Sequence, residues 1–485
     1  MMKFSAFLII SFASALVHAA DPKESDFYKI TTFDTPLETA MEVSSIELLP
    51  GGKLALGTRR GEIWTVSGAN AEPAKVQYQL YAAGQHEVMG LAWKDGSLFT
   101  TNRYEVSRLK DEDGDGRADL FDTLTDKWGV SGDYHEYSFG SRFDKNGDLW
   151  IVLCLTGSFN SDIDFRGWAM RVKPDGTLVP TCSGIRSPAG IDFDADGEVY
   201  YSDNQGPWHG SSTLQHLKPG SFQGHPGGFV WYDKAPNMGP RPVEPKDKSR
   251  MVKERERVKE LLPPAVYMVH GKIGNSTSFI VCDTSKGKFG PFQKQLFVAD
   301  QCFSNISRVF LEEVNGIKQG VVFPFLQGFK SGLIGGRMNE NGQIFAGGSD
   351  RGWGAKGGKP HSFERVDWTG KVPFEVHEMR ARPDGFELTF TEPVDPVSAG
   401  NPASYKTRAF TYIYQADYGS PEVDDVIPQI TKAVVGADNK SVRLTFDKLT
   451  KGHVHELHLD GVKSASGLPV LHASAYYTLN EIPAK

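Results

Sequence analysis

An apolar strand candidate that follows a tight turn recurs along most of the chain. The six occurrences span residues 52–56, 96–99, 147–151, 197–201, 294–298 and 342–345. Asp or Asn beside glycine in several of these turns suits hairpins that require a positive φ. A second strand candidate follows in most occurrences, for example Val106–Leu109 and Ala169–Lys173. The pattern therefore predicts a series of small antiparallel sheets.

The spacing of these units is close to that of a known repeat architecture. Counted from the residue after each turn, the gaps are 44, 51, 50, 97 and 48 residues. Strand repeats of about 50 residues are typical of β-propeller blades, which are four-stranded sheets. Six occurrences predict six blades over residues 21–370. The double gap holds either a seventh blade or an insertion, and the Lys-, Arg-, Glu- and Pro-rich residues 233–264 favour an insertion.

The pattern changes after Gly370 to strict alternation of apolar and polar residues. Phe386–Phe390 and Val442–Phe446 are two examples, and such alternation is typical of half-buried antiparallel strands. Residues 371–485 suit an immunoglobulin-like β-sandwich. Several aromatic residues there either line a binding face or fill the core: Tyr405, Phe410, Tyr412, Tyr414 and Tyr418. The predicted fold class is all-β, a six-bladed β-propeller followed by an immunoglobulin-like β-sandwich.

Composition supports this fold class and narrows the kinds of partner. The 52 Gly and 28 Pro exceed ordinary usage, as expected of a chain with many turns. Sixty acidic against 53 basic side chains give a net charge of −7, and no large basic block occurs. Binding of nucleic acid rests on Lys and Arg that neutralise phosphates, so we expect no nucleic-acid partner.

Residues 1–20 have the features of a secretory signal peptide. Lys3 supplies the positive charge, Phe4–Val17 form an apolar core, and Ala19 and Ala20 offer small residues for cleavage. The apolar core is shorter than the ~20 residues of a membrane span. We expect a periplasmic or secreted protein with no membrane span after signal removal. In such a compartment the cysteines could form disulfides, and Cys282 with Cys302 is the expected pair because both fall in one repeat.

The segment from Asp111 to Asp122 has the spacing of a calcium-binding loop. Calcium prefers six to eight oxygen ligands, and EF-hand loops supply them at fixed positions around a glycine at position 6, here Gly116 in the sequence DEDGDGRAD. The alternative is a solvated acidic turn. We expect a structural calcium between blades. Its candidate ligands are the carboxylates of Asp111, Asp113, Asp115, Asp119 and Asp122 and the backbone carbonyl of Arg117.

Polar residues at the same phase of successive repeats are candidates for a site on the axis of the propeller. His135 and Arg186 both precede inner strand candidates, and Gln205 follows one. Because the ordinary pKa of histidine is about 6.5, His135 is a candidate general base. Arg186 could stabilise a developing oxyanion or hold a carboxylate. Each residue taken alone could equally be structural, so the prediction rests on their meeting in one axial pocket.

Three motifs in order carry a resemblance to a known family. His135 lies ahead of a turn-strand of the sequence FDKNG at residues 143–147, Arg186 begins an Arg-Ser-Pro segment, and Gln205, Gly206 and Pro207 form Gln-Gly-Pro. Over residues 40–370 the chain resembles the soluble quinoprotein glucose/sorbosone dehydrogenases, six-bladed propellers that use pyrroloquinoline quinone and calcium. The resemblance implies that His135 and Arg186 are catalytic and that Gln205, Gly206 and Pro207 bind the cofactor.

The later blades depart from the pattern of that family. The family holds the quinone carboxylates with a lysine and two arginines. This chain has Asp300-Gln301-Cys302 where the family has the lysine. Residues 330–334 stand where the family has the arginine pair, but they contain no arginine, and Arg337 lies three residues beyond them. Three functions therefore stay open. One is a quinone-dependent oxidation of a carbohydrate, with a separate electron-acceptor protein, and another is a non-catalytic module that binds a glycan or a protein. The third is a calcium-dependent propeller hydrolase, which fits the acidic residues but for which the sequence offers no convincing nucleophile.

Overall fold

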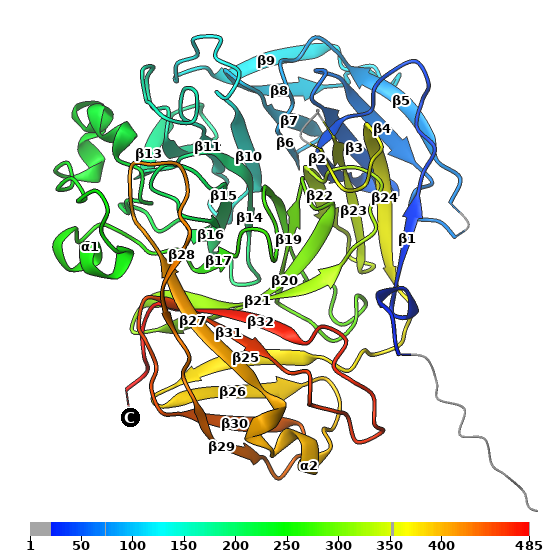
Figure 1. Cartoon of the computed structure of the whole chain (residues 1–485). Coiled ribbons are helices and arrows are strands. Elements are labelled where there is room, and N and C mark those ends of the chain that lie inside the picture. Colours follow the sequence, from blue (N-terminus) through cyan, green and yellow to red (C-terminus); the bar gives the residue numbers. More distant parts are fainter. Residues whose placement is uncertain (1–20, 73, 351–353, 485) are drawn as a thin grey trace, which may run out of the picture.

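The computed structural model describes residues 21–72, 74–350 and 354–484, and it is all-β (Figure 1). The predicted signal peptide lies outside the described residues. Six four-stranded antiparallel units follow one another along the chain. The first unit contains β2 (Val43–Leu49), β3 (Lys53–Thr58), β4 (Ile63–Ser67) and β5 (Gln77–Ala82), and the second contains β6 (Gly90–Lys94), β7 (Ser97–Thr101), β8 (Val106–Lys110) and β9 (Leu120–Thr125). The third contains β10 (Ser138–Phe143), β11 (Leu149–Leu153), β12 (Trp168–Val172) and β13 (Leu178–Ser183), and the fourth contains β14 (Pro188–Phe193), β15 (Val199–Asp203), β16 (Ser212–His216) and β17 (Val266–Met268). The fifth contains β18 (Thr277–Cys282), β19 (Leu296–Asp300), β20 (Asn305–Val314) and β21 (Ile317–Leu326), and the sixth contains β22 (Gly335–Met338), β23 (Gln343–Ser349), β24 (His361–Trp368) and β1 (Tyr28–Thr32).

The first strand of each unit contacts the first strand of the next, and β22 contacts β2. These innermost strands thus surround one axis, an arrangement consistent with a β-propeller. The N-terminal strand β1 pairs with β24, so the last sheet is completed by the beginning of the chain. The innermost strands approach closely: a Cβ atom at Gly90 would lie 2.7 Å from Cα of Gly140 on the neighbouring unit. Glycine at both positions permits this approach.

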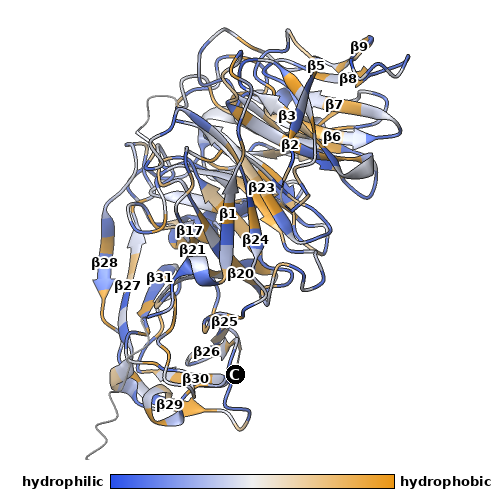
Figure 2. Ribbon diagram, turned by 90° about the vertical axis from the view of Figure 1, so that its right-hand side faces the viewer, coloured by the Kyte–Doolittle hydropathy of each residue, from blue (hydrophilic) through white to orange (hydrophobic). Residues whose placement is uncertain are grey.

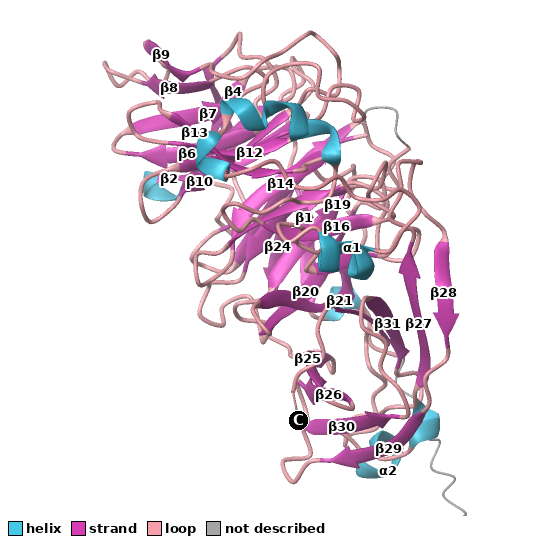
Figure 3. Ribbon diagram, turned by 90° about the vertical axis from the view of Figure 1, so that its left-hand side faces the viewer, coloured by secondary structure: helices cyan, strands magenta, loops and turns pink. Residues whose placement is uncertain are grey.

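The double gap in the repeat corresponds to a long connection within one sheet. Between β16 and β17 the chain forms η3 (Pro226–Lys234), η4 (Pro236–Met238) and α1 (Met251–Arg257), and these described residues include no further strand. Figure 3 shows the short helices outside the sheets. The predicted insertion over residues 233–264 is therefore confirmed, with α1 as its α-helix, and no seventh sheet separates the fourth and fifth units.

The C-terminal strands are joined to the fifth unit. One sheet is separate and contains β25 (Val376–Arg382), β26 (Gly385–Phe390), β30 (Ser441–Phe446) and β29 (Ile430–Val435). The other strands extend the fifth unit in the order β21, β32 (Ser474–Leu479), β31 (His453–His458), β27 (Lys406–Tyr412) and β28 (Glu422–Val426) (Figure 1). Their common core includes Phe323 of β21 and Phe386 of β26. The C-terminal region therefore packs directly on a blade, and its immunoglobulin-like topology stays a prediction.

Many strand residues are apolar, as the hydropathy colours of Figure 2 show, and most of the buried apolar residues belong to strands. Among the described residues, none of the helices combines the length and the apolar character that crossing a bilayer requires. All four cysteines are free thiols. The expected Cys282–Cys302 disulfide is wrong because Cys282 ends β18, whereas Cys302 follows the opposite end of the paired strand β19.

A buried histidine joins the N-terminal segment to the C-terminal region. His472 Nδ1 lies 2.5 Å from Oε1 of Glu375, and its Nε2 lies 3.0 Å from Oε1 of Glu24. Burial alone would lower the pKa of His472, but the two carboxylates raise it to about 9. The protonated form therefore bridges three parts of the chain that are far apart in sequence.

This bridge predicts a pH-dependent stability. Since the folded pKa exceeds the unfolded value of about 6.5, its contribution is fully present below pH ~6.5 and is lost as pH rises through about 9. Urea denaturation of the wild type should show a loss of up to about 3 kcal/mol over that range. His472→Gln should remove this slope, whereas His453→Gln on β31 should keep it. Equal slopes in the wild type and His472→Gln would contradict the assignment.

Candidate functional site

The site predicted on the axis is a cavity of about 280 Å³ at the end where the innermost strands begin. His135 precedes β10, Arg186 precedes β14 and Ile334 precedes β22, so each is delivered by the loop that enters an innermost strand. His135, Arg186 and Gln205 all line this cavity. Three candidates that lie far apart in sequence thus meet in one pocket, which we call the axial pocket.

His135 is held by a turn. Its backbone N–H donates to Oδ1 of Asp133 (2.8 Å), which also accepts from the backbone of Gly157 (2.9 Å). Burial opposes ionisation of Asp133, but these backbone donors hold its pKa below the usual range. The ring of Tyr134 lies 4.0 Å from the imidazole. The imidazole is half-buried in the wall of the axial pocket, where it could exchange a proton with a bound hydroxyl.

Arg186 holds backbone carbonyls around the axial pocket. Its Nη1 donates to the carbonyls of Gln205 (2.6 Å) and Asn204 (3.4 Å), and its Nε donates to the carbonyl of Ser158 (3.2 Å). Its guanidinium also lies 5.2 Å from the centre of the Tyr418 ring. Arg186 is therefore a positioning residue that connects loops of two blades with the C-terminal region.

Only part of the Gln-Gly-Pro motif reaches the axial pocket. Gln205 lines it, and its Nε2 donates to the carbonyl of Gly210 (3.0 Å). Gly206 lies behind Arg186: a Cβ atom there would lie 2.1 Å from Cζ of the arginine. Pro207 is buried and forms a backbone bridge with Tyr418. Gly206 and Pro207 thus support the arginine and a loop, outside the lining of the pocket.

Two polar atoms of the wall have no protein partner. Asn204 Oδ1 and Ser278 Oγ are buried, and neither has a hydrogen-bond partner among the described residues. Both residues line the axial pocket, together with Ser276 and Thr277. A buried polar atom without a partner costs free energy. The neighbouring lining residues Ser276 and Thr277 offer hydroxyl groups that can bond a polar ligand.

The charges of the axial pocket do not fit a quinone with three carboxylates. The described residues that line the axial pocket include two arginines, Arg59 and Arg186, and no lysine. Arg59 is already paired with Glu42 (3.4 Å) and Glu87 (3.2 Å). Gln301, Cys302 and Ile334 line the region where the resemblance implies a lysine and two arginines. Each missing charge-assisted hydrogen bond is worth ~1.5–3 kcal/mol, so the residues present favour an uncharged ligand.

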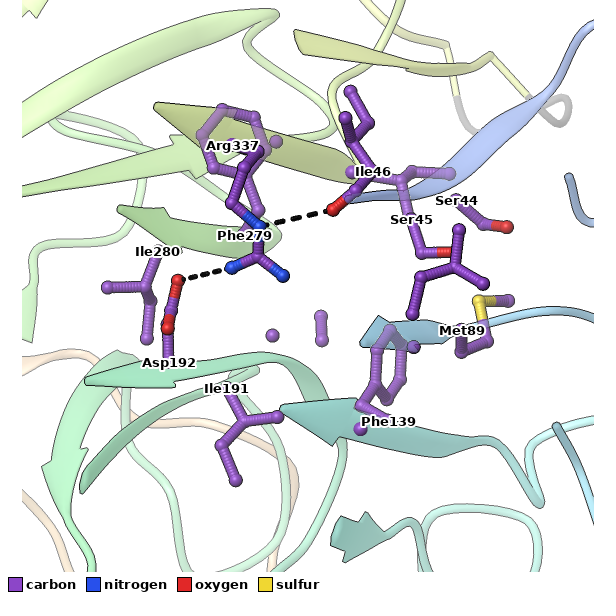
Figure 4. Close-up of a pocket in the computed structure, with 18 residues that line it drawn as sticks. Ser44, Ser45, Ile46, Met89, Phe139, Ile191, Asp192, Phe279, Ile280 and Arg337 are labelled. Atoms are coloured by element: carbon purple, nitrogen blue, oxygen red, sulfur yellow. Dashed lines mark hydrogen bonds and ion pairs between the residues drawn. The ribbon is translucent and has the colours of Figure 1, made fainter. Parts of the chain in front are cut away.

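The displaced Arg337 takes part in a buried ion cluster farther along the axis (Figure 4). Its Nη1 lies 2.8 Å from Oδ2 of Asp192 and its Nη2 lies 2.8 Å from Oε2 of Glu47. Asp192 Oδ1 is also 2.8 Å from Nη2 of Arg142. Two arginines and two carboxylates from four innermost strands therefore balance one another. This ion cluster lies at the ends of the strands opposite to the axial pocket.

The predicted calcium loop lies between β8 and β9, outside the axial pocket. Carboxylate oxygens of Asp111, Asp113 and Asp115 lie within 4.8 Å of one another. Asp119 Oδ2 accepts from the backbone N–H groups of residues 112 (2.8 Å) and 113 (3.4 Å), and the backbone N–H of Arg117 donates to Asp115 Oδ1 (2.8 Å). Asp122, on β9, forms an ion pair with Arg108 of β8 (2.8 Å). The structure brings three of the six candidates together, and calcium stays a prediction.

Sequence reasoning did not single out Tyr418. Of the five aromatic residues considered between 405 and 418, Tyr405, Phe410, Tyr412 and Tyr414 are buried and only Tyr418 lines the axial pocket. It belongs to residues 413–421, the loop that connects β27 and β28. Because the C-terminal region packs on the fifth unit, this loop reaches the fourth unit and contacts the pocket there.

Comparison with known proteins supports the fold. A family model described as a domain of unknown function (DUF7133) matches residues 77–314. No curated protein matches the chain. An oxidoreductase from Thermus thermophilus, described as a glucose dehydrogenase, is 16% identical with a TM-score of 0.51, and the match covers 70% of this chain and 99% of that one.

Two further solved structures are similar. A Trichoderma reesei protein of the carbohydrate-active enzyme family AA12 is 12% identical with a TM-score of 0.50 and covers 74% of this chain and 100% of its own. The PQQ-bound aldose sugar dehydrogenase of Streptomyces coelicolor is 14% identical with a TM-score of 0.48 and covers 72% and 100%. The resemblance to soluble glucose dehydrogenases that the sequence motifs indicated is thus confirmed for the fold.

Proposed function

We propose that the axial pocket binds a neutral carbohydrate. The observation that carries this proposal is the set of uncharged polar residues that line the axial pocket, among them Asn204, Gln205 and Ser276, while the two arginines of the lining are already held by protein partners. Sugar hydroxyls both donate and accept hydrogen bonds, so they can bond to such residues, and ligand pockets combine apolar walls with a few such polar groups. The fold shared with a structure described as a glucose dehydrogenase and with a carbohydrate-active enzyme supports the same ligand class.

Oxidation of the bound sugar is the second candidate function. It is favoured because His135 and Arg186 line the same pocket as the proposed sugar site. His135 would remove the proton of a hydroxyl, and Arg186 would keep the wall in place. The pocket does not fit the expected quinone, so the hydride of the oxidised carbon would have to pass to an electron acceptor without carboxylates. A glycan- or protein-binding module without catalysis remains the alternative.

The remaining features of the proposal follow from the sequence. The signal-like residues 1–20 favour export to the periplasm or the medium, where glycans are accessible ligands. A calcium ion held by Asp111, Asp113 and Asp115 would stabilise the loop between β8 and β9. The six units and the C-terminal strands would form a six-bladed propeller and an immunoglobulin-like sandwich, respectively.

Calorimetry with glucose, xylose, cellobiose and maltose tests the proposal. We expect saturable binding of at least one sugar to the wild type. Asn204→Ala should weaken it by about 3–10-fold, the value of one hydrogen bond. The matched control, Asn146→Ala, changes an exposed turn residue and should bind like the wild type. No saturable binding of any of these sugars would contradict the proposal.

Dye reduction in the presence of the quinone and calcium separates binding from oxidation. The charges of the pocket predict no quinone-dependent turnover in the wild type. If turnover occurs, and His135→Ala lowers it by about 10²–10⁴-fold, the protein is a quinone-dependent dehydrogenase and the charge argument is wrong.

A further inference from the structure

The loop that carries Tyr418 is fixed to the blade that carries Gln205. The backbone N–H of Gly419 donates to the carbonyl of Gly206 (3.1 Å), and the backbone N–H of Trp208 donates to the carbonyl of Gln415 (2.6 Å). Pro207 forms a backbone bridge with Tyr418 between these two contacts. The loop thus continues the segment that follows β15, as an added wall of the axial pocket.

The base of the same loop is buried. Tyr414 is 3% exposed, its hydroxyl donates to the carbonyl of Gly224, and its backbone pairs with Ser249. Its ring also lies 5.0 Å from that of Trp208. The loop is therefore held by the connection between β16 and β17 as well as by the fourth unit, and its position is defined by packing.

Exposed aromatic side chains gather at this edge of the axial pocket. Tyr418 is 61% exposed, Phe159 51% and Tyr134 42%, although Tyr418 and Tyr134 line the pocket and Phe159 directly follows the lining residue Ser158. The rings of Phe159 and Tyr418 lie 6.5 Å apart. They come from the third unit and from the C-terminal region. Grouped exposed apolar side chains beside a pocket are typical of a ligand surface.

We propose that Tyr418 and Phe159 form a stacking surface for a second sugar ring, so that the ligand is an oligosaccharide. This inference rests on the proposed carbohydrate binding in the axial pocket. The C–H face of a pyranose packs on aromatic rings, and two adjacent rings at the edge of the pocket suit the sugar unit linked to the one inside. Arg186, 5.2 Å from the Tyr418 ring, connects the two positions. The C-terminal region thus sets the length of glycan that the pocket selects.

Calorimetry with glucose, cellobiose and cellotetraose tests this inference. In the wild type the affinity should rise at least 10-fold from the monosaccharide to the tetrasaccharide. Tyr418→Ala and Phe159→Ala should each abolish most of that rise. Phe159 lies outside the pocket lining, so Phe159→Ala should also leave the affinity for glucose within about 3-fold. Tyr418→Phe should keep the rise because the ring remains. Tyr104→Ala, which changes another exposed aromatic residue outside the pocket lining, is the matched control.

The outcomes separate the inference from the proposed function. If no sugar binds to the wild type, the proposed function fails. If glucose binds as well as cellotetraose, or if Tyr418→Ala keeps the rise, only the inference is overturned. Hydrogen exchange on the wild type covers the case in which a variant does not fold. Cellotetraose should protect residues 413–421 together with 204–210, and protection of 204–210 alone would overturn the inference.

Discussion

Asp192→Ala should lower the free energy of unfolding by about 3–5 kcal/mol, the cost of removing one member of a buried ion pair. Asp192 is 3% exposed and pairs with Arg142 and Arg337, both at 2.8 Å. Without it, two arginines of the axis would face Glu47 alone. The loss acts on four blades at once, because each of the four residues lies on a different innermost strand. Urea denaturation of both proteins at neutral pH measures this difference.

The same ion cluster predicts a sensitivity to acid. Burial alone would raise the pKa of Asp192, but Arg142 and Arg337 hold it below its ordinary value. Because the pKa of Asp192 is lower in the folded than in the unfolded protein, its ionised form stabilises the fold at pH values above the unfolded pKa of ~4. This contribution is lost as the pH falls through the folded pKa. Asp196→Asn, in the exposed turn after β14, is the control. Equal stabilities of Asp192→Ala and Asp196→Asn would show that the ion cluster contributes nothing.

Arg186→Met should weaken sugar binding by about 10–100-fold, which corresponds to the ~1.5–3 kcal/mol of a charge-assisted hydrogen bond. The variant keeps the apolar stem of the side chain but releases the carbonyls of Ser158, Asn204 and Gln205. The wall that carries Asn204 and Gln205 would then relax. Tyr418 would also lose the guanidinium beside its ring. Calorimetry with cellobiose measures the effect.

A conservative variant separates charge from geometry at this position. Arg186→Lys keeps the positive charge but cannot bridge three carbonyls, so its affinity should lie between those of Arg186→Met and the wild type. Arg171→Met, on the third unit away from the pocket lining, controls for the general cost of removing an arginine. If Arg186→Met binds cellobiose as tightly as Arg171→Met does, Arg186 does not position the wall.

The repeat could be predicted from the sequence because it is local. Each turn and the strand after it are specified by glycine and by apolar residues within a few positions. Glycine gives a further signal of the repeat in the sequence: Gly90, Gly140 and Gly190 recur every 50 residues on the innermost strands. A Cβ atom at Gly190 would lie 2.5 Å from the carbonyl oxygen of Ser278. This glycine repeat marks the places where successive blades crowd the axis.

Other features depend on contacts that periodicity does not encode. The pairing of β32 with β21 joins residues far apart in sequence, so the alternation after Gly370 predicted strands but not their partner. The same pairing brings Tyr418 to the axial pocket. Arg337 could be recognised as displaced from the expected cation positions, but its partners, Asp192 and Glu47, come from other blades. Such pairs become visible only once the innermost strands surround one axis.

A crystal structure of the protein soaked with cellobiose would show whether the axial pocket binds a sugar. We expect one sugar ring in the axial pocket, within hydrogen-bond distance of Asn204 and Ser276, and the second ring against Tyr418. Sugar bound elsewhere, with the pocket between His135 and Arg186 filled only by water, would contradict this expectation.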